Sequence, residues 1–292
     1  MSRENNWGNK TLKLGIIGSS LSHSLSPSLF QIVSNYHNIN LVYLPFEIAE
    51  SQLSEAILGL KALNFRGVNV TIPYKEKCFK FCDCLSEEAE TIEAVNVLYF
   101  SNDKIYGYNT DIFGILESLS PYKEKLVKKN FLIIGAGGAA KSAVYTIIKE
   151  FSPFRIYLAV RNENKANEFA NYFSKKLNFG NFETLNLNNE KIIDALTDST
   201  CIVNCSPVGS FPNNDENPLG HFAIFKSHHI VFDMIYNPLD TKLIKLAKSQ
   251  GVVAFSGLKM LTAQAYKAFE IWTGQKFAVD KIEKALRFYL TN

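Results

Sequence analysis

The sequence predicts an α/β protein with two domains, and three features lead to this prediction. An apolar run rich in β-branched residues, Phe131–Ile134, ends in a cluster of glycines and continues into a helical pattern. Short strand patterns alternate with helical ones before this point, and the order after it is strand, helix, strand. The chain closes with two amphipathic helical stretches that do not continue the second pattern, so we expect them to pack back on the first domain.

The first domain is expected to cover residues 1–110 and to be completed by residues 258–292. Its strands are predicted at residues 12–17, 41–47, 67–71, 95–100 and 104–108, and its helical stretches at residues 27–36, 51–63, 75–84, 258–272 and 279–290. Ser101, Asn102 and Asp103 separate the last two of these strands, which is the composition of a hairpin turn.

The second domain is expected to cover residues 111–257 and to be entered through a helix that starts near Asp111 and leads through Pro121. A loop rich in Pro, Asn and Asp is predicted at residues 211–218. Buried parallel strands are predicted at residues 131–134, 155–160 and 201–204, and further strands at residues 229–233 and 252–255. Helices are predicted at residues 138–148, 165–177 and 238–249.

The residues from Gly135 to Ala140 have the spacing G-x-G-x-x-G/A of a dinucleotide-binding turn. Gly135 would permit the tight turn, and Gly137 would let the backbone approach a pyrophosphate, because a Cβ there would collide with it. The start of the following helix offers free N–H groups and the positive end of its dipole. The alternative is a tight strand–helix connection with no ligand. The strand and the alanine-rich helix on either side favour a cofactor site formed by Gly135, Ala136, Gly137, Gly138 and Ala139.

The composition limits the classes of protein to consider. Of the 292 residues, 47% are hydrophobic and 20% are charged, a balance typical of a globular protein in water. The net charge of +3 is too small to argue for nucleic acid or a membrane as a partner, and no apolar run is long enough to span a bilayer. Residues 1–10 are polar and lack the apolar core of a signal peptide, so we expect a short disordered lead and a cytoplasmic protein.

The five cysteines do not form a zinc-type pattern. Cys82 and Cys84 flank Asp83, and a metal site with His37 or His23 is one interpretation, but no second pair of ligands at zinc spacing follows. We therefore expect no metal, and reduced thiols that are buried or half-exposed.

Several short motifs follow one another in order along the chain. They are Gly18 followed by His23-Ser24-Leu25-Ser26-Pro27, then Asn69-Val70-Thr71-Ile72-Pro73-Tyr74-Lys75, Ala94-Val95-Asn96-Val97, Asn109-Thr110-Asp111, Asp233-Met234-Ile235-Tyr236, and Gly257-Leu258-Lys259-Met260-Leu261 with Gln264. Together with the dinucleotide-binding turn, this succession resembles the shikimate dehydrogenase family, in a match that runs from about Leu12 to the end of the chain. One departure is Gly18-Ser19-Ser20, where the family often has Gly-Asn-Pro, and it affects the turn more than the chemistry.

The resemblance implies a fold, a reaction and a set of site residues. The fold has an α/β substrate domain, formed by the N-terminal part and the C-terminal helices, and a Rossmann-type dinucleotide-binding domain between them. The reaction is the reversible reduction of 3-dehydroshikimate to shikimate with NADPH, in the pathway to chorismate and the aromatic amino acids. Ser24 and Ser26 would hold the substrate carboxylate, and Tyr236 would approach from the nucleotide domain. The ring hydroxyls would be surrounded by Thr71, Lys75, Asn96, Asp111 and Gln264, and the cofactor would also contact Met234 and Gly257.

These residue types suit the reduction of a carbonyl, which needs a hydride on carbon and a proton on oxygen. NADPH brings the hydride. Lys75 is the predicted proton donor, because a lysine that loses its hydration in a cleft gives up its proton more readily than one in water. Asp111 would orient Lys75 and offset its charge. Neutral hydroxyl and amide groups around the ring would give specificity, because a missing substrate hydroxyl would leave them unpaired.

Each of these residues also has a purely structural interpretation. The serines before Pro27 could cap a helix. Lys75 could be a solvated lysine in the first turn of a helix, and Asp111 a helix N-cap. Gln264 has the weakest local argument, since glutamines are common within helices, and His23 is interpreted as structural. The order of the motifs, rather than any one residue, favours the catalytic interpretation.

The choice of cofactor depends on the loop after the strand at residues 155–160, which meets the adenosine ribose in this fold. Arg161 follows the strand directly and could stack on adenine or bind the 2′-phosphate of NADP, with Asn162 beside it. Lys165 would add a positive charge, whereas Glu163 would suit the free 2′-hydroxyl of NAD, and a merely solvated helix start would set no preference. We expect NADP.

Two other functions are weighed against this one. A quinate/shikimate dehydrogenase of the same superfamily would use NAD and accept quinate, and Ser24, Ser26 and Arg161 argue against it. A protein that only senses a metabolite or nucleotide needs no proton donor, so Lys75 and Asp111 argue against that class. We expect a monomer or a homodimer whose partners are shikimate and 3-dehydroshikimate, with neither nucleic acid nor a membrane among them.

Overall fold

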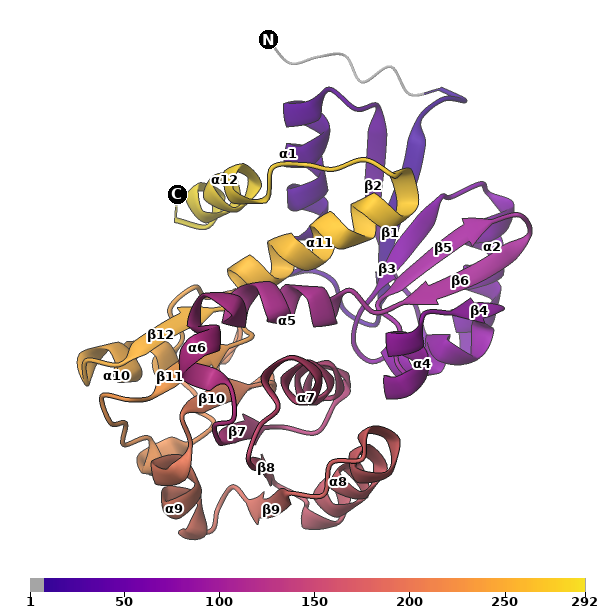
Figure 1. Cartoon of the computed structure of the whole chain (residues 1–292). Helices are drawn as coiled ribbons and strands as arrows, with labels where there is room; N and C mark the ends of the chain where they lie inside the picture. The colour runs from indigo at the N-terminus through magenta and orange to yellow at the C-terminus, as the bar shows by residue number, and fades with distance from the viewer. Residues whose placement is uncertain (1–7, 292) are drawn as a thin grey trace. The chain divides into compact units, whose positions relative to one another are not determined.

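The computed structural model describes residues 8–291 and divides into two compact units, each built on a six-stranded sheet (Figure 1). Unit 1 comprises the residues up to Thr110 and those from Thr262 on, and unit 2 comprises Asp111–Leu261. Most of the expected N-terminal lead, residues 1–7, lies outside the described residues. Between residues 8 and 291, no helix has the length and apolar character needed to cross a bilayer. The predicted α/β fold class is confirmed, with one sheet in each unit.

The sheet of unit 1 is mixed, with parallel strands on one side and a hairpin on the other. Asn102 and Asp103 have positive φ values of 49° and 58°, the conformation of a type I′ turn, and connect β5 to its antiparallel neighbour β6 as predicted. The strands are β1 (Leu12–Gly18), β2 (Leu41–Glu47), β3 (Gly67–Val70), β4 (Cys84–Leu85), β5 (Val97–Ser101) and β6 (Lys104–Tyr108), in the order β2-β1-β3-β5-β6-β4.

The helices of unit 1 agree with the prediction except between residues 75 and 92. The predicted helix at residues 75–84 stops after Cys78, because a 3₁₀ turn follows and Cys84 pairs with Tyr106 of β6. The next helix was not predicted, although Ser86 caps it by accepting a hydrogen bond from the backbone N–H of Ala89 at 3.3 Å. The helices are α1 (Ser26–His37), α2 (Leu53–Ala62), α3 (Lys75–Cys78), α4 (Glu87–Ile92), α12 (Val279–Thr291) and, from Thr262 on, α11 (Leu258–Thr273).

The closing helix α11 packs on the sheet of unit 1, as expected from its poor fit to the second domain. The indole Nε1 of Trp272 donates a hydrogen bond of 3.0 Å to the backbone oxygen of Leu98 on β5. Phe30 of α1 lies 5.8 Å from the Trp272 ring and stacks on Tyr43 of β2 at 4.3 Å. In Figure 1 the yellow α11 accordingly lies beside the indigo α1.

Gly67 makes this packing possible, and Gly67→Ala should destabilise unit 1. A Cβ at this position would overlap both Trp272 Nε1 and the backbone oxygen of Leu98. We expect overpacking to lower the free energy of unfolding by about 1–3 kcal/mol, measured by urea denaturation. Gly59→Ala is the matched control, because a Cβ at Gly59 in α2 meets nothing within 4 Å. Equal stability of the two variants would contradict this account.

The sheet of unit 2 is parallel throughout, and its strand order reverses in the middle. Its order β12-β11-β10-β7-β8-β9 is that of two mononucleotide-binding halves meeting between β10 and β7. The strands are β7 (Phe131–Ile134), β8 (Ile156–Val160), β9 (Phe182–Asn186), β10 (Cys201–Asn204), β11 (Ile230–Asp233) and β12 (Val253–Ser256).

Helices cover both faces of this sheet (Figure 1). Ile192 and Leu196 of α9 and Leu243 of α10 form one core with β7, β8, β10 and β11. On the opposite face, Phe151 of α7 meets Phe131 of β7 with ring centroids 6.1 Å apart. The helices are α5 (Asp111–Leu119), α6 (Lys123–Leu126), α7 (Gly138–Phe151), α8 (Glu163–Leu177), α9 (Lys191–Asp198) and α10 (Lys242–Ser249).

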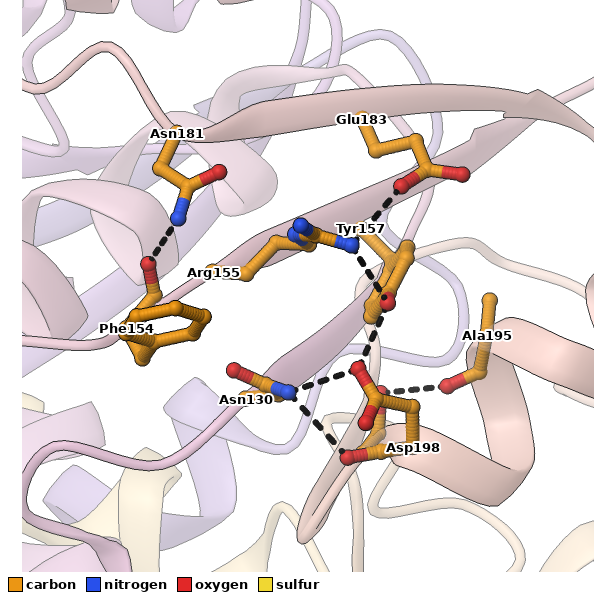
Figure 2. Close-up of polar contacts among 9 residues, drawn as sticks. Asn130, Phe154, Arg155, Tyr157, Asn181, Glu183, Ala195 and Asp198 are labelled. Atoms are coloured by element: carbon orange, nitrogen blue, oxygen red, sulfur yellow. Dashed lines mark hydrogen bonds and ion pairs between the residues drawn. The ribbon is translucent and has the colours of Figure 1, made fainter.

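A polar network closes the amino ends of β7, β8 and β9 (Figure 2). The Asp198 carboxylate accepts hydrogen bonds from the Tyr157 hydroxyl at 2.6 Å and from Asn130 Nδ2 at 2.7 Å. Arg155 Nη1 donates to the Tyr157 hydroxyl at 3.1 Å and to Glu183 Oε2 at 3.2 Å. Desolvation is the main cause that raises the pKa of Tyr157. The network therefore holds the first residues of these three strands together, at the edge of the sheet opposite the dinucleotide-binding turn.

Candidate active site

The segments predicted to bind the cofactor all leave one edge of the unit 2 sheet. Ile134, Asn204, Asp233 and Ser256 lie opposite one another in register at the carboxyl ends of β7, β10, β11 and β12. The loops that follow therefore gather on both sides of the point where the strand order reverses. Parallel α/β sheets bind their ligands at this edge.

The two glycines of the dinucleotide-binding turn differ in whether the protein's own geometry demands them. Gly135 has φ +105°, and a Cβ there would come within 3.4 Å of the backbone of Cys205 and Ser206. Gly137 has an ordinary φ of −94°, and a Cβ there would meet no protein atom within 4 Å. Neither strain nor internal packing demands glycine at 137, so the alternative of a plain tight connection leaves it unexplained. α7 begins at Gly138, and no side chain in the described part of the chain caps it, so its first N–H groups are available to a phosphate.

The predicted cofactor residues Met234 and Gly257 lie against each other. A Cβ on Gly257 would overlap the backbone oxygen of Met234, so only glycine allows this approach. The Gly257 N–H also donates a hydrogen bond of 2.9 Å to the backbone oxygen of Ile235. Tyr236, predicted to reach the substrate, is the next residue along this loop and is half-buried.

Asp233 and Asn204 form a buried polar centre beneath these loops, and neither was predicted to have a role. Asp233 accepts hydrogen bonds from Asn204 Nδ2 at 2.9 Å, from the Ile235 N–H at 3.1 Å and from Thr241 Oγ1 at 2.7 Å. Desolvation raises the pKa of Asp233 to about 6, against the effect of these hydrogen bonds. The signal that could have found them is a polar residue directly after a buried parallel strand.

The residues proposed to read the ribose lie at the other half of the same edge. Arg161 follows β8 directly, and both Arg161 and Lys165 are exposed. Asn162 is the N-cap of α8, and its Oδ1 accepts hydrogen bonds from the N–H groups of Asn164 at 3.1 Å and Lys165 at 3.4 Å. Asn162 therefore has a structural role whether or not it also touches a cofactor.

The predicted substrate residues of unit 1 also gather at one edge of their sheet. Ile17 pairs with Val70, and Val97 pairs with both Asn69 and Tyr108. Because β5 is antiparallel to β3 and β6, its start lies beside their carboxyl ends. The segments after β1, β3 and β6 and before β5 thus meet, and they carry Ser24, Ser26, Thr71, Lys75 and Asn96.

A chain of buried hydrogen bonds connects two of these predicted residues, Asn96 and Gln264. The Thr110 N–H donates to Asn96 Oδ1 at 2.7 Å, and Thr110 Oγ1 donates to Gln264 Oε1 at 3.4 Å. On the other side, the Tyr43 hydroxyl donates to Asn69 Oδ1 at 2.7 Å, and Asn69 Nδ2 donates to the Asn96 backbone oxygen at 3.2 Å. Tyr43 was not singled out, because a tyrosine within a strand pattern gives no signal of a polar partner.

The structure bears on the purely structural interpretations of Ser24, Ser26, Lys75 and Asp111. α1 begins at Ser26, its N-cap position is Leu25, and no side chain of residues 8–291 caps it. Ser24 Oγ accepts a long hydrogen bond of 3.4 Å from the Ser26 N–H. Lys75 is the half-buried first residue of α3, and Asp111 is the buried first residue of α5.

The cysteines are free thiols, as predicted. Desolvation raises the pKa of Cys78 and of Cys82 to about 12, so neither is ionised near neutral pH. His23 is exposed. Within residues 8–291, no group of three or more His, Cys, Asp or Glu side chains is arranged to hold a metal ion.

Comparisons with known proteins place this geometry in a family. The model of the shikimate dehydrogenase substrate binding domain matches residues 16–98, and that of the shikimate 5′-dehydrogenase C-terminal domain matches residues 257–287. A shikimate dehydrogenase (NADP(+)) from Carboxydothermus hydrogenoformans is 40% identical over 277 residues, which are 95% of this chain and 97% of that protein. A solved shikimate dehydrogenase structure from Aquifex aeolicus has 34% identity and a TM-score of 0.85, covering 96% of this chain and 99% of that one. A shikimate dehydrogenase crystallised with NADP⁺ has 33% identity and a TM-score of 0.88, with 98% of both chains covered. The chain belongs to the shikimate dehydrogenase family.

Proposed function

We propose that this chain is an NADP-dependent oxidoreductase that interconverts 3-dehydroshikimate and shikimate, a step toward chorismate and the aromatic amino acids. The observation that carries the proposal is the 40% identity, over 95% of the chain, to a relative named shikimate dehydrogenase (NADP(+)). The open, uncapped start of α7 beside Gly137 fits the phosphates of a dinucleotide. NADPH, when bound, supplies the hydride.

The two units are assigned different tasks. Residues 1–110 with 258–292 would bind the substrate, and residues 111–257 would bind NADP. The first turn of α11, residues 258–261, belongs to unit 2 in the structure, so the second boundary falls within one continuous helix. We also infer a cytoplasmic enzyme that acts as a monomer or homodimer, without nucleic acid or a membrane as partner.

Within unit 1, hydroxyl and amide groups would recognise the substrate. Ser24 and Ser26 would donate hydrogen bonds to its carboxylate. Asn96 and Gln264 belong to one buried network, so their amides are held in place before substrate binds. Thr71 would complete the contacts to the ring hydroxyls, with Tyr236 approaching from the nucleotide domain. A substrate that lacks a hydroxyl would leave such groups unpaired, which costs affinity.

Lys75 and Asp111 are the proposed catalytic residues. In the direction of reduction, the Lys75 ammonium would donate a proton to the carbonyl oxygen while the hydride reaches the carbon. In the reverse direction the neutral amine would take the proton back. Asp111 would orient the ammonium and balance its charge.

A spectrophotometric assay tests the proposed function. The chain should reduce NADP⁺ with shikimate as the electron donor, followed by the absorbance of NADPH. Quinate in place of shikimate, and NAD⁺ in place of NADP⁺, test the rival dehydrogenase. A folded protein that turns over neither acid with either cofactor would favour the non-catalytic sensing module instead.

The serines provide a second test, through substrate affinity. Ser24→Ala and Ser26→Ala should each raise KM for shikimate by the equivalent of about 1–3 kcal/mol, because each removes a hydrogen bond to a charged carboxylate. NADP⁺ binding should change little. Ser28→Ala in the first turn of α1 is the control. Normal shikimate binding by both variants, with melting temperatures several degrees lower, would assign the serines to the helix start instead.

A further inference from the structure

In the binding mode typical of this fold, the nicotinamide half of NADP would lie over the second half of the unit 2 sheet. A dinucleotide crosses the edge where the strand order reverses, with one mononucleotide over each half. The ribose-reading position, where Arg161 stands, follows β8 in the half formed by β7, β8 and β9. The strands of the other half, β10, β11 and β12, lie side by side in Figure 1. This half would therefore bind the nicotinamide.

Asn204 at the end of β10 uses both ends of its amide to hold the loop that follows. Its Oδ1 accepts hydrogen bonds from the Ser206 N–H at 3.0 Å and from Ser206 Oγ at 2.7 Å. Its Nδ2 donates to the Val208 backbone oxygen at 3.4 Å and to Asp233 Oδ1 at 2.9 Å. The conformation of this loop thus depends on the carboxylate of the neighbouring strand.

Asp233 at the end of β11 holds the next loop in the same way. Its Oδ1 also accepts from the Ile235 N–H at 3.1 Å, and Ile235 in turn accepts from the Gly257 N–H at 2.9 Å. Its Oδ2 accepts from Thr241 Oγ1 at 2.7 Å, and Thr241 caps α10 by accepting from the Ile244 N–H at 3.2 Å. One carboxylate therefore connects two loops and a helix start.

The chemistry of the partners explains why an acid stands here. The amide, the backbone N–H and the hydroxyl all donate to Asp233, so the ionised carboxylate, an acceptor at both oxygens, satisfies all three. Asp233 and Asn204 have no exposed surface and Thr241 is 1% exposed, so a lost partner cannot be replaced by solvent without rearrangement.

We propose that Asp233 is a positioning residue for the nicotinamide, acting through Asn204 and Thr241 to fix the loops that follow β10 and β11. This inference rests on the proposed function, because it assumes that NADP binds at this edge. Asp233 would not touch the cofactor itself. Its hydrogen bonds would fix the positions of the Cys205–Ser206 and Met234–Tyr236 segments. Removing its hydrogen bonds should therefore weaken contacts to one half of NADP and spare those to the other half.

Binding of NADP⁺ and of adenosine 2′,5′-bisphosphate, which is the adenosine half of NADP⁺ without the nicotinamide, tests the proposal by calorimetry. Thr241→Val and Asp233→Asn should raise the Kd of NADP⁺ by about tenfold or more, the effect of one lost hydrogen bond to a charged group. The Kd of adenosine 2′,5′-bisphosphate should stay within about twofold. Thr241→Ser keeps the hydroxyl and should bind NADP⁺ like the wild type.

The control is Tyr157→Phe, which removes a hydrogen bond to an aspartate at the opposite edge of the same sheet (Figure 2). It should lower the melting temperature without a selective loss of NADP⁺. Unchanged NADP⁺ affinity in Thr241→Val, or equal losses for both ligands, would overturn the proposal. Thr241→Val decides the matter if Asp233→Asn does not fold. Failure of the proposed function would appear separately, as a wild-type protein that binds neither ligand.

Discussion

Lys75→Ala should lower kcat for shikimate oxidation by about a hundredfold or more, the usual contribution of a positioned acid–base group. The effect on KM for shikimate should be smaller, because the proton moves in the transition state whereas the ring hydroxyls keep their other partners. Lys75 is half-buried at the start of α3, at the edge of the sheet where the predicted substrate residues gather. Steady-state kinetics with saturating NADP⁺ measures both parameters.

Lys77→Ala is the matched control for Lys75→Ala. Lys77 lies on the same short helix and forms an ion pair with Glu50, so its loss tests the effect of removing a lysine and disturbing α3. It should leave kcat within about twofold, since ion pairs at the surface contribute little to stability. A near wild-type kcat for folded Lys75→Ala, with hydride transfer shown to be rate-limiting by an isotope effect, would rule out Lys75 as the proton donor.

Arg161→Ala should weaken NADP⁺ binding by about 1.5–3 kcal/mol, the range for hydrogen bonds to charged groups, and change NAD⁺ binding much less. Arg161 is exposed at the end of β8, and only NADP⁺ carries the 2′-phosphate proposed to meet it. Lys165→Ala should act in the same direction but more weakly, because an ammonium cannot bind a phosphate through two parallel hydrogen bonds. The preference should also shrink with rising salt, since both groups are exposed.

Comparing kcat/KM for the two cofactors in the wild type and in Arg161→Ala measures this preference directly. Lys175→Ala is the control for net charge, because it removes an exposed charge from the last turn of α8, the helix that carries Lys165. Equal losses for NADP⁺ and NAD⁺ would show that Arg161 serves adenine or the fold rather than the 2′-phosphate.

Elements with a strong local signal were predictable from the chain alone. The predicted bounds of β2, β6, β7 and β10 agree with the structure, because each is an apolar or alternating run between polar or glycine-rich segments. The hairpin followed from Asn102 and Asp103, which tolerate positive φ. The dinucleotide-binding turn could also be predicted, because its glycines directly follow a buried strand and precede a helix.

Several elements escaped prediction, most of them because their local signals are weak. The helices α4 and α6 are short, so few turns repeat their apolar positions. The strand β9 lies at the edge of its sheet, and of its residues only Leu185 is buried. The helix α9 has a well-separated apolar face formed by Ile192, Ala195 and Leu196, and this pattern could have been found.

The partners of the buried polar side chains were decided only by the tertiary structure. Asn204 and Asp233 are 29 residues apart in sequence, and they meet because β10 and β11 are neighbours in register. Thr110 and Gln264 are 154 residues apart and meet because α11 returns to the first sheet. Hydrophobic periodicity predicts which face of an element is buried, because burial follows the local repeat of the backbone. It does not predict the strand order or the register. The strand order and the register decide which polar groups lie opposite one another.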